Sequence, residues 1–142
     1  MRLIHFTIAA AAIAASPAFA GDPAAGERSW RQCMACHMIV APDGEVIQRG
    51  QQTGPNLYGV IGRQAGTYPG FEGRYSSSMV EAGEMGLVWD RESFLQYVAN
   101  PRRFLTDYTG TPGSMGFNLA RGGEDLYAYL ATFSEADTDT EE

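Results

Sequence analysis

The sequence has no lysine, only two cysteines and only two histidines. Its 17 acidic residues and ten basic residues, all arginine, give a net charge of −7 at pH 7. This charge excludes nucleic acid and anionic membrane surfaces as expected partners. Cys33 and Cys36 are too few for a disulfide framework. They lie within one helical turn, so a bond between them would constrain almost no chain.

Long apolar runs are also missing, apart from a short one at the N-terminus. Residues 1–20, MRLIHFTIAAAAIAASPAFA, combine the basic Arg2, a short apolar run and a small-x-small site that ends at Ala20. This pattern is typical of a secretory signal peptide. The run is shorter than the roughly 20 residues that a membrane span needs. We therefore expect cleavage after Ala20, export to the periplasm and no membrane insertion.

The expected mature chain is more acidic and has a single histidine. Removal of residues 1–20 takes away Arg2 and His5, which leaves nine arginines against 17 acidic residues, a net charge of −8, and His37. We expect one domain over residues 21–133, followed by a disordered acidic tail over residues 134–142.

Apolar periodicity predicts three or four helices, two long loops and almost no strand. The expected helices cover residues 22–36, 76–83, 91–99 and 123–133, and the loops cover residues 41–70 and 105–118. These loops are rich in glycine and other turn-forming residues and have little apolar content of their own. Such loops rarely stay ordered unless they pack against another part of the molecule. A large bound cofactor would provide a surface for this packing.

The motif CMACH, residues 33–37, has four interpretations. A structural zinc site needs about four ligands, and no second pair of cysteines or histidines is present. A thioredoxin-like redox pair would follow a strand, whereas a helix is expected here. An inert cysteine pair in a helix also stays open. In an exported protein, however, C-x-x-C-H is the pattern of c-type haem attachment, which we favour.

The axial ligands of such a haem would come from few residues. His37 follows the second cysteine directly, and a histidine ligand needs an acceptor for its other ring nitrogen. The carbonyl of Pro55 could serve, although Pro55 alone is an ordinary turn proline. No second histidine remains, so methionine is the candidate for the sixth position. Met115 is favoured, because it lies in a Gly/Pro-rich loop with little core to fill.

Taken in order along the chain, these motifs resemble those of class I c-type cytochromes, in particular the bacterial cytochrome c2 type. The resemblance covers residues 21–133. It is carried by the motifs CMACH, TGPNLYGVIGRQAGTYP, the tryptophan at 89, ESFLQYVANPRRF, SMGF and EDLYAYL. It implies an all-α cytochrome c fold, with three to four helices and long loops wrapped around one covalently attached haem c.

The resemblance also implies a role for each site residue. Cys33 and Cys36 would carry the thioether bonds, and His37 and Met115 would be the axial ligands of the iron. Further haem contacts are implied for the residues Pro55, which orients His37; Arg63, Trp89 and Tyr75, at the propionates; Tyr97, near the methionine sulfur; and Phe117, beside the exposed haem edge. FEGRY has two residues more than is usual before this tyrosine, which weakens the match of Tyr75.

The function implied is that of an electron carrier, not an enzyme. Its expected partners are a cytochrome bc1 complex as donor and a photosynthetic reaction centre or haem-copper oxidase as acceptor, and we expect a monomer. The alternative is a gas sensor or peroxidase-like enzyme with a displaceable sixth ligand. Reaction with peroxide would need a distal histidine or arginine, and the sequence offers neither near Met115.

One departure from the family concerns the haem edge. Relatives usually surround this edge with lysines, whereas this chain has Gln32 before the first cysteine and Ser114 before Met115. Two explanations stay open. Local arginines could form the docking surface, namely Arg31, Arg102, Arg103 and Arg121, or the surface is adapted to high salt, which screens long-range attraction. We expect that association with its partners depends only weakly on salt.

Overall fold

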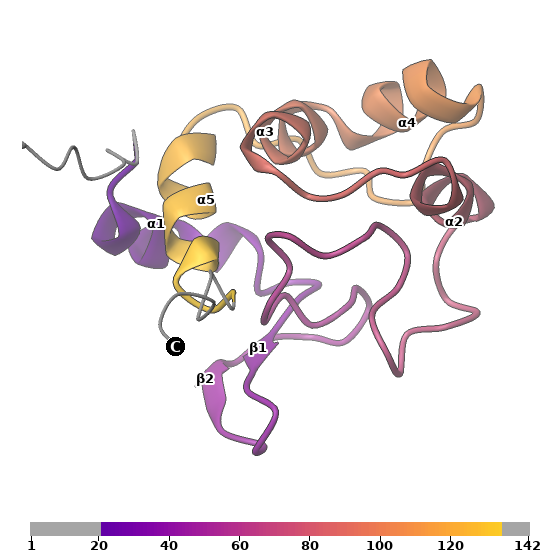
Figure 1. The fold of residues 1–142 in the computed structure, drawn as a ribbon. Helices are drawn as coiled ribbons and strands as arrows, with labels where there is room; N and C mark the ends of the chain where they lie inside the picture. The colour runs from indigo at the N-terminus through magenta and orange to yellow at the C-terminus, as the bar shows by residue number, and fades with distance from the viewer. Residues whose placement is uncertain (1–20, 135–142) are drawn as a thin grey trace, which may run out of the picture.

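The computed structural model describes residues 21–134, which form short helices, a two-stranded hairpin and long loops (Figure 1). The expected signal peptide and acidic tail lie outside the described residues, except Ser134. The elements are α1 (Pro23–Ser29), the 3-10 helix η1 (Trp30–Gln32), β1 (Ile39–Val40), β2 (Val46–Gln48), α2 (Ser77–Glu84), α3 (Arg91–Ala99), α4 (Pro101–Thr109) and α5 (Gly123–Ala131). None of the described helices is long and apolar enough to span a membrane.

Helices α1 and α5, from opposite ends of the chain, pack directly on each other (Figure 1). Gly26 is buried at their contact, and a Cβ there would overlap the backbone carbonyl of Asp125 and crowd Tyr129. The missing side chain lets the two backbones approach closely. Trp30, Leu126 and Tyr129 are buried beside this contact.

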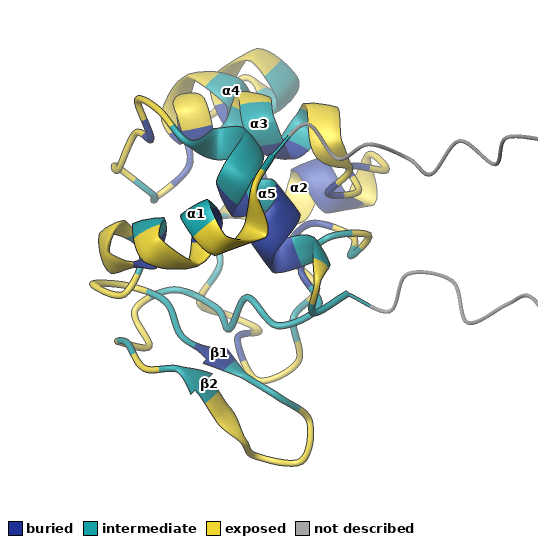
Figure 2. Cartoon of the chain, turned by 90° about the vertical axis from the view of Figure 1, so that its left-hand side faces the viewer, coloured by how far each residue is buried: buried dark blue, intermediate teal, exposed yellow. Residues whose placement is uncertain are grey.

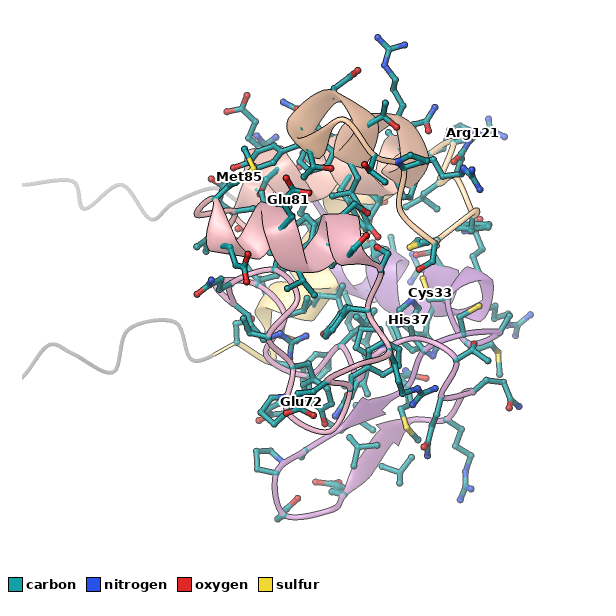
Figure 3. All side chains as sticks on the ribbon, turned by 90° about the vertical axis from the view of Figure 1, so that its right-hand side faces the viewer. Cys33, His37, Glu72, Glu81, Met85 and Arg121 are labelled. Atoms are coloured by element: carbon teal, nitrogen blue, oxygen red, sulfur yellow. The ribbon has the colours of Figure 1, made fainter. Side chains whose placement is uncertain are left out.

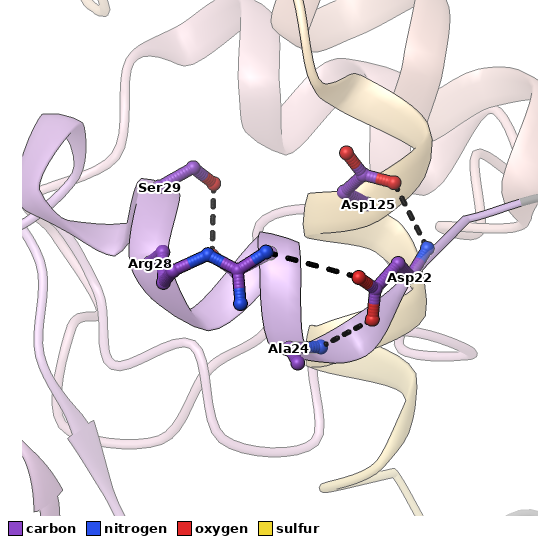
Figure 4. A network of polar contacts seen from close by, with 6 residues as sticks. Asp22, Ala24, Arg28, Ser29 and Asp125 are labelled. Carbon is purple, nitrogen blue, oxygen red and sulfur yellow. Dashed lines mark hydrogen bonds and ion pairs between the residues drawn. The ribbon is translucent and has the colours of Figure 1, made fainter.

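Polar groups secure the start of α1 against α5, as Figure 4 shows. Asp22 caps α1, because its carboxylate accepts a hydrogen bond from the Ala24 N–H (2.9 Å), and Pro23 occupies the first helical position. The Asp22 N–H donates to the Asp125 carboxylate (2.9 Å). The two ends of the domain are thus joined by packing and by a hydrogen bond.

The α-helical part of the first helix is shorter than predicted. It ends at Ser29 instead of Cys36, and η1 and a series of turns follow. Hydrogen bonds from the Cys33 N–H to the Trp30 carbonyl (2.7 Å) and from the His37 N–H to the Cys33 carbonyl (2.9 Å) keep these turns tight. They bring His37 next to both cysteines.

The described part of the chain has five α-helices, more than the three or four predicted, because a sequence such as Asn100-Pro101 favours the end of a helix. Pro101 does end α3, but it is also the first residue of α4. Asn100 lies between them and accepts a hydrogen bond from the Arg103 N–H (3.1 Å), which caps α4. The predicted loop over residues 105–118 therefore begins only after Thr109.

The remaining secondary structure covers the cavity from two sides. Helix α2 packs on α4, and α3 packs on both α4 and α5. The antiparallel hairpin of β1 and β2 projects on the other side of the molecule (Figure 1). Figure 2 shows that burial is concentrated on the inner faces of the helices and on β1. The helices thus form one wall of the cavity and the long loop over residues 49–76 forms much of the other.

Candidate functional site

A cavity of about 360 Å³ lies between the helices and the long loops. Apolar residues from all parts of the fold face it, including Leu57, Val60, Phe94, Leu126 and Leu130. All ten residues that the sequence singled out line this cavity: Cys33, Cys36, His37, Pro55, Arg63, Tyr75, Trp89, Tyr97, Met115 and Phe117. The fold thus brings together residues that are up to 84 positions apart in the sequence.

His37 is held by the loop that follows it. Its Nδ1 lies 2.8 Å from the Pro55 carbonyl oxygen, and since a carbonyl only accepts, Nδ1 carries the proton. Nε2 therefore keeps a free lone pair, the form that binds a metal. Burial lowers the pKa of His37, and the hydrogen bond to Pro55 opposes this effect in part. The net lowering favours the neutral ring.

Gly54 is a site residue that the sequence reasoning missed. A Cβ at this position would overlap the imidazole ring of His37, so only glycine leaves room for the ring. The Gly54 N–H also donates to the Cys36 carbonyl (2.7 Å). The close contact with His37 therefore requires a glycine at position 54 of the TGPN sequence. In the sequence, the only signal for this role is its place directly before Pro55.

The two cysteines are free thiols beside this histidine, as Figure 3 shows for Cys33 and His37. Cys33 is half-buried and Cys36 is exposed. Burial, and to a lesser extent the nearby charge of Cys36, raise the pKa of Cys33 to about 11. Within residues 21–134, no group of three or more His, Cys, Asp or Glu side chains could hold a metal ion, so the zinc interpretation lacks a ligand set there.

Arg63 provides a half-buried cation at one end of the cavity. Its guanidinium donates to the carbonyls of Tyr58 (3.2 Å) and Asn56 (3.1 Å) and lies 4.9 Å from the centre of the Tyr68 ring. Burial lowers the pKa of Arg63, but an arginine stays protonated in proteins. Tyr75, whose pKa is raised by burial, accepts a hydrogen bond from the Tyr68 N–H (3.2 Å). This end is suited to an anionic group.

Arg74 adds a second cation that the sequence analysis did not single out. It belongs to the FEGRY segment, which has two extra residues, and it lines the cavity although it is exposed. Its guanidinium lies 4.3 Å from the centre of the Phe71 ring and donates to the Gln52 carbonyl. Arg74 thus joins the extended segment to the loop that supports His37. No sequence signal distinguished it from a surface arginine.

Aromatic residues line the cavity wall formed by α3. The ring centres of Trp89 and Tyr97 lie 4.8 Å apart, and both rings pack near Phe104. Tyr97 is half-buried against the core, and desolvation raises its pKa well above the usual value, so its hydroxyl stays protonated. Met115 is half-buried and Phe117, two residues later, is 41% exposed. The site therefore reaches the surface at Phe117.

The cavity fits a haem c on its own chemistry. The wall of the cavity is mainly apolar, and two free thiols and an oriented imidazole line it. Arg63 and Arg74 also line it and could neutralise acidic groups of a bound molecule. The missing side chain of Gly54 leaves room for the ring that would bind the iron. These features are what a covalently held, mostly apolar iron cofactor with acidic side groups requires.

The comparison with curated proteins found close relatives, although no family model matches the chain. The chain is 50% identical over 126 residues to the cytochrome c2 of Rhodobacter capsulatus, covering 87% of this chain and 90% of the relative. It is 40% identical over 138 residues to the cytochrome c-550 of Paracoccus versutus, covering 92% of this chain and 88% of the relative.

The comparison with solved structures finds the same two kinds of protein. The ferric cytochrome c-550 of Paracoccus versutus matches with a TM-score of 0.76 and 39% identity, covering 80% of this chain and 98% of that one. The cytochrome c2 of Rhodobacter capsulatus matches with a TM-score of 0.73 and 49% identity, covering 79% and 97%. These matches confirm the all-α cytochrome c fold. The chain therefore belongs to the cytochrome c2 and c-550 family of class I c-type cytochromes, which are haem-containing electron carriers and not enzymes.

Proposed function

We propose that this protein is a periplasmic one-electron carrier with one covalently attached haem c. Cys33 and Cys36 form the thioether bonds, and His37 and Met115 are the axial ligands. The observation that carries this proposal is that both free thiols, the oriented imidazole and Met115 line a single apolar cavity. Haem c supplies an iron that alternates between the ferric and ferrous states. The domain of residues 21–133 acts as a monomer after removal of residues 1–20.

The histidine side of the site keeps one ligand in a fixed orientation. Pro55 accepts the Nδ1 proton, so Nε2 is presented as the ligand atom, and this bond raises the basicity of the ring. Because burial lowers the pKa of His37, the neutral form of the ring, which binds iron, is favoured.

The methionine side and the apolar wall set the reduction potential. A thioether ligand favours the ferrous iron, and exclusion of water by Trp89, Phe94 and Tyr97 disfavours the extra charge of the ferric state. Arg63 and Arg74 compensate the acidic side groups at the other end of the cavity. These effects together favour a high potential, as a carrier that accepts electrons from a quinol-oxidising complex requires.

Electrons leave and enter at the exposed rim of the cavity, formed by Gln32, Cys33, Ser114 and Phe117. The segments that carry these residues, 28–42 and 108–123, contain arginines but no acidic residue. Figure 3 shows Glu72 and Glu81 well away from Cys33. The proposed donor is a cytochrome bc1 complex, and the proposed acceptor is a photosynthetic reaction centre or a haem-copper oxidase. A rim without acidic groups avoids repulsion by acidic partner surfaces.

The visible spectrum of the purified protein, in the ferric and ferrous states, tests this proposal. We expect a weak sulfur-to-iron band at the red end of the ferric spectrum and no change when CO is added to the ferrous protein. Met115→Ala should abolish the band and admit CO. Met85→Ala, which removes an exposed methionine outside the cavity, should change neither.

Two results would overturn the proposal. CO binding by the unmodified ferrous protein, with no sulfur-to-iron band, would indicate an open sixth position and a gas sensor or peroxidase-like enzyme. A colourless protein, produced together with the haem-attachment machinery, would exclude covalent haem altogether.

A further inference from the structure

The segment that carries Met115 is attached to the fold at its two ends. At one end the Pro112 carbonyl accepts a hydrogen bond from the Ser78 hydroxyl (3.2 Å), and at the other the Leu119 N–H donates to the Val98 carbonyl (2.8 Å). Within residues 21–134, no hydrogen bond involves residues 113–118. The position of Met115 therefore depends on few polar contacts.

Ser78 is the one polar residue with a fully buried side chain in the described part of the protein. A buried hydroxyl is costly unless it is hydrogen-bonded. Ser78 lies within α2, yet its hydrogen bond leads out of the helix to another segment. Its hydroxyl thus joins two elements and is not explained by the stability of α2 alone.

The direction of this hydrogen bond follows from the groups around it. Ser78 has a single hydroxyl proton, and the Pro112 carbonyl can only accept, so Ser78 donates to Pro112. The Ser76 hydroxyl, 3.0 Å away, must then donate to Ser78, while it accepts the Met79 N–H at the start of α2 (3.3 Å). A directed chain of hydrogen bonds runs from the N-terminus of α2 to the loop of Met115.

Packing places the same loop against a second helix. A Cβ at Gly113 would lie 2.5 Å from a methyl carbon of Leu105, which is fully buried in α4. Since α2 and α4 pack on each other, Pro112 and Gly113 sit where both helices meet the loop. Loss of the hydrogen bond there would free the loop next to Met115, three residues beyond Pro112.

We propose that Ser78 is a positioning residue, which holds the Met115 segment against α2 through the Pro112 carbonyl and so limits how often Met115 leaves the iron. This inference rests on the proposed function in one respect, namely that Met115 is the axial ligand. It adds a residue that touches neither the cavity nor the iron.

Imidazole binding to the ferric holoprotein tests the proposal. At saturating imidazole, the observed rate equals the rate at which Met115 leaves. Ser78→Ala should raise this rate about tenfold, because the Pro112 carbonyl loses a buried partner. Ser77→Ala removes the neighbouring, exposed serine of the same helix and should leave the rate unchanged. Ser78→Thr keeps the hydroxyl and should stay close to the unmodified protein.

The free energy of unfolding, measured by denaturant on the same variants, separates positioning from general stability. Under the proposal, Ser78→Ala accelerates imidazole binding more than Gly26→Ala, which disturbs the distant contact of α1 and α5. Equal rates for Ser78→Ala and Ser77→Ala would overturn the proposal, as would a Ser78→Thr variant as fast as Ser78→Ala. Should Ser78→Ala yield no holoprotein, Ser78→Cys provides the test, because a thiol is a weak donor to the Pro112 carbonyl. A rate unchanged by Ser78→Cys would then overturn the proposal.

The proposed function fails in a different way. A missing sulfur-to-iron band in the unmodified protein would show that Met115 is not the ligand, before any Ser78 variant is made. A normal band, together with unchanged imidazole rates in Ser78→Ala, would remove the role of Ser78 and leave the proposed function intact.

Discussion

The two sides of the cavity are held in different ways. On the histidine side, the segments 34–38 and 51–57 are joined by backbone hydrogen bonds from Gln51 to Met34 (2.9 Å), from Gly54 to Cys36 (2.7 Å) and from Leu57 to Met38 (3.0 Å). The bond from His37 to Pro55 adds a fourth link. On the methionine side, residues 113–118 take part in no hydrogen bond with the described part of the chain.

This difference indicates which ligand is fixed and which can exchange. The histidine side loses several hydrogen bonds at once if it moves, so His37 is expected to stay in place whenever the domain is folded. The methionine side moves at the cost of few bonds, so under the proposed ligation Met115 is expected to leave first. The predictions below test this contrast, from the largest expected effect to the smallest.

Replacement of a glycine by alanine should cost much more stability on the histidine side than on the methionine side. Gly54→Ala places a Cβ in the His37 ring, which must shift away from Pro55, and we expect a loss of about 3 kcal/mol in the free energy of unfolding and little haem-loaded protein. Gly116 also lines the cavity, but a Cβ there would meet no protein atom within 4 Å, so Gly116→Ala should destabilise the fold less than Gly54→Ala. Denaturant unfolding and the yield of holoprotein measure both. A stable, fully loaded Gly54→Ala variant would show that the histidine side is not rigid.

Arg63 tests how much the stability of the site depends on this half-buried cation. Arg63→Gln leaves the carbonyls of Tyr58 and Asn56 with at most one donor, and the expected loss of stability is about 1–3 kcal/mol. Removal of the positive charge should also lower the reduction potential, because a nearby cation favours the ferrous state. Arg103→Gln, which removes only an exposed ion pair with Asp107, is the control and should leave the potential unchanged. Potentiometric titration and denaturant unfolding provide the two measurements.

Asp90 tests the helices behind the cavity without touching the site. It caps α3, and hydrogen bonds from Ser93 lower the pKa of its carboxyl group. Asp90→Ala should cost about 1 kcal/mol at pH 7. A lowered pKa in the folded state means that this stability is present above the usual carboxyl pKa and is lost as pH falls through the lowered value. The difference from the unmodified protein should therefore shrink in acid. Ser77→Ala, which removes an exposed side chain without a titratable group, should show no such change with pH.

The rim, where the two sides meet, should give the smallest effect. With Gln32 and Ser114 in place of basic residues, electron transfer to a purified haem-copper oxidase should change less than about threefold between low salt and roughly 0.5 M salt. The double variant Gln32→Lys and Ser114→Lys adds two positive charges to the rim and should show a steeper dependence. A steep loss of rate in the unmodified protein would contradict the expectation and point to its arginines as the docking charges.

Much of the helical structure could be predicted, but the junctions could not. Helix α3 was predicted with its observed bounds, because Asp90 is a strong N-cap and its apolar stripe is regular. Helix α4 was missed, since Asn100-Pro101 is at once the end of one helix and the start of the next, and local rules do not separate these roles. The first helix was extended too far, because the tight turns around the cysteines share its composition.

By itself, the sequence determined the family and the residues to examine. The order C-x-x-C-H leaves few chemical alternatives, and a chain with one histidine outside the expected signal peptide offers one imidazole ligand there. These conclusions depend on residue type and spacing, which are local properties. They needed no knowledge of which segments lie side by side.

Only the tertiary structure decided which backbone and hydroxyl groups support those residues. The need for glycine at position 54, the link from Arg74 to Gln52 and the chain from Ser76 through Ser78 to Pro112 each join segments that are distant in sequence. Glycine, serine and arginine occur at many surface positions, so their composition carries no signal. Their roles arise from close contact and burial, which exist only once the chain has folded.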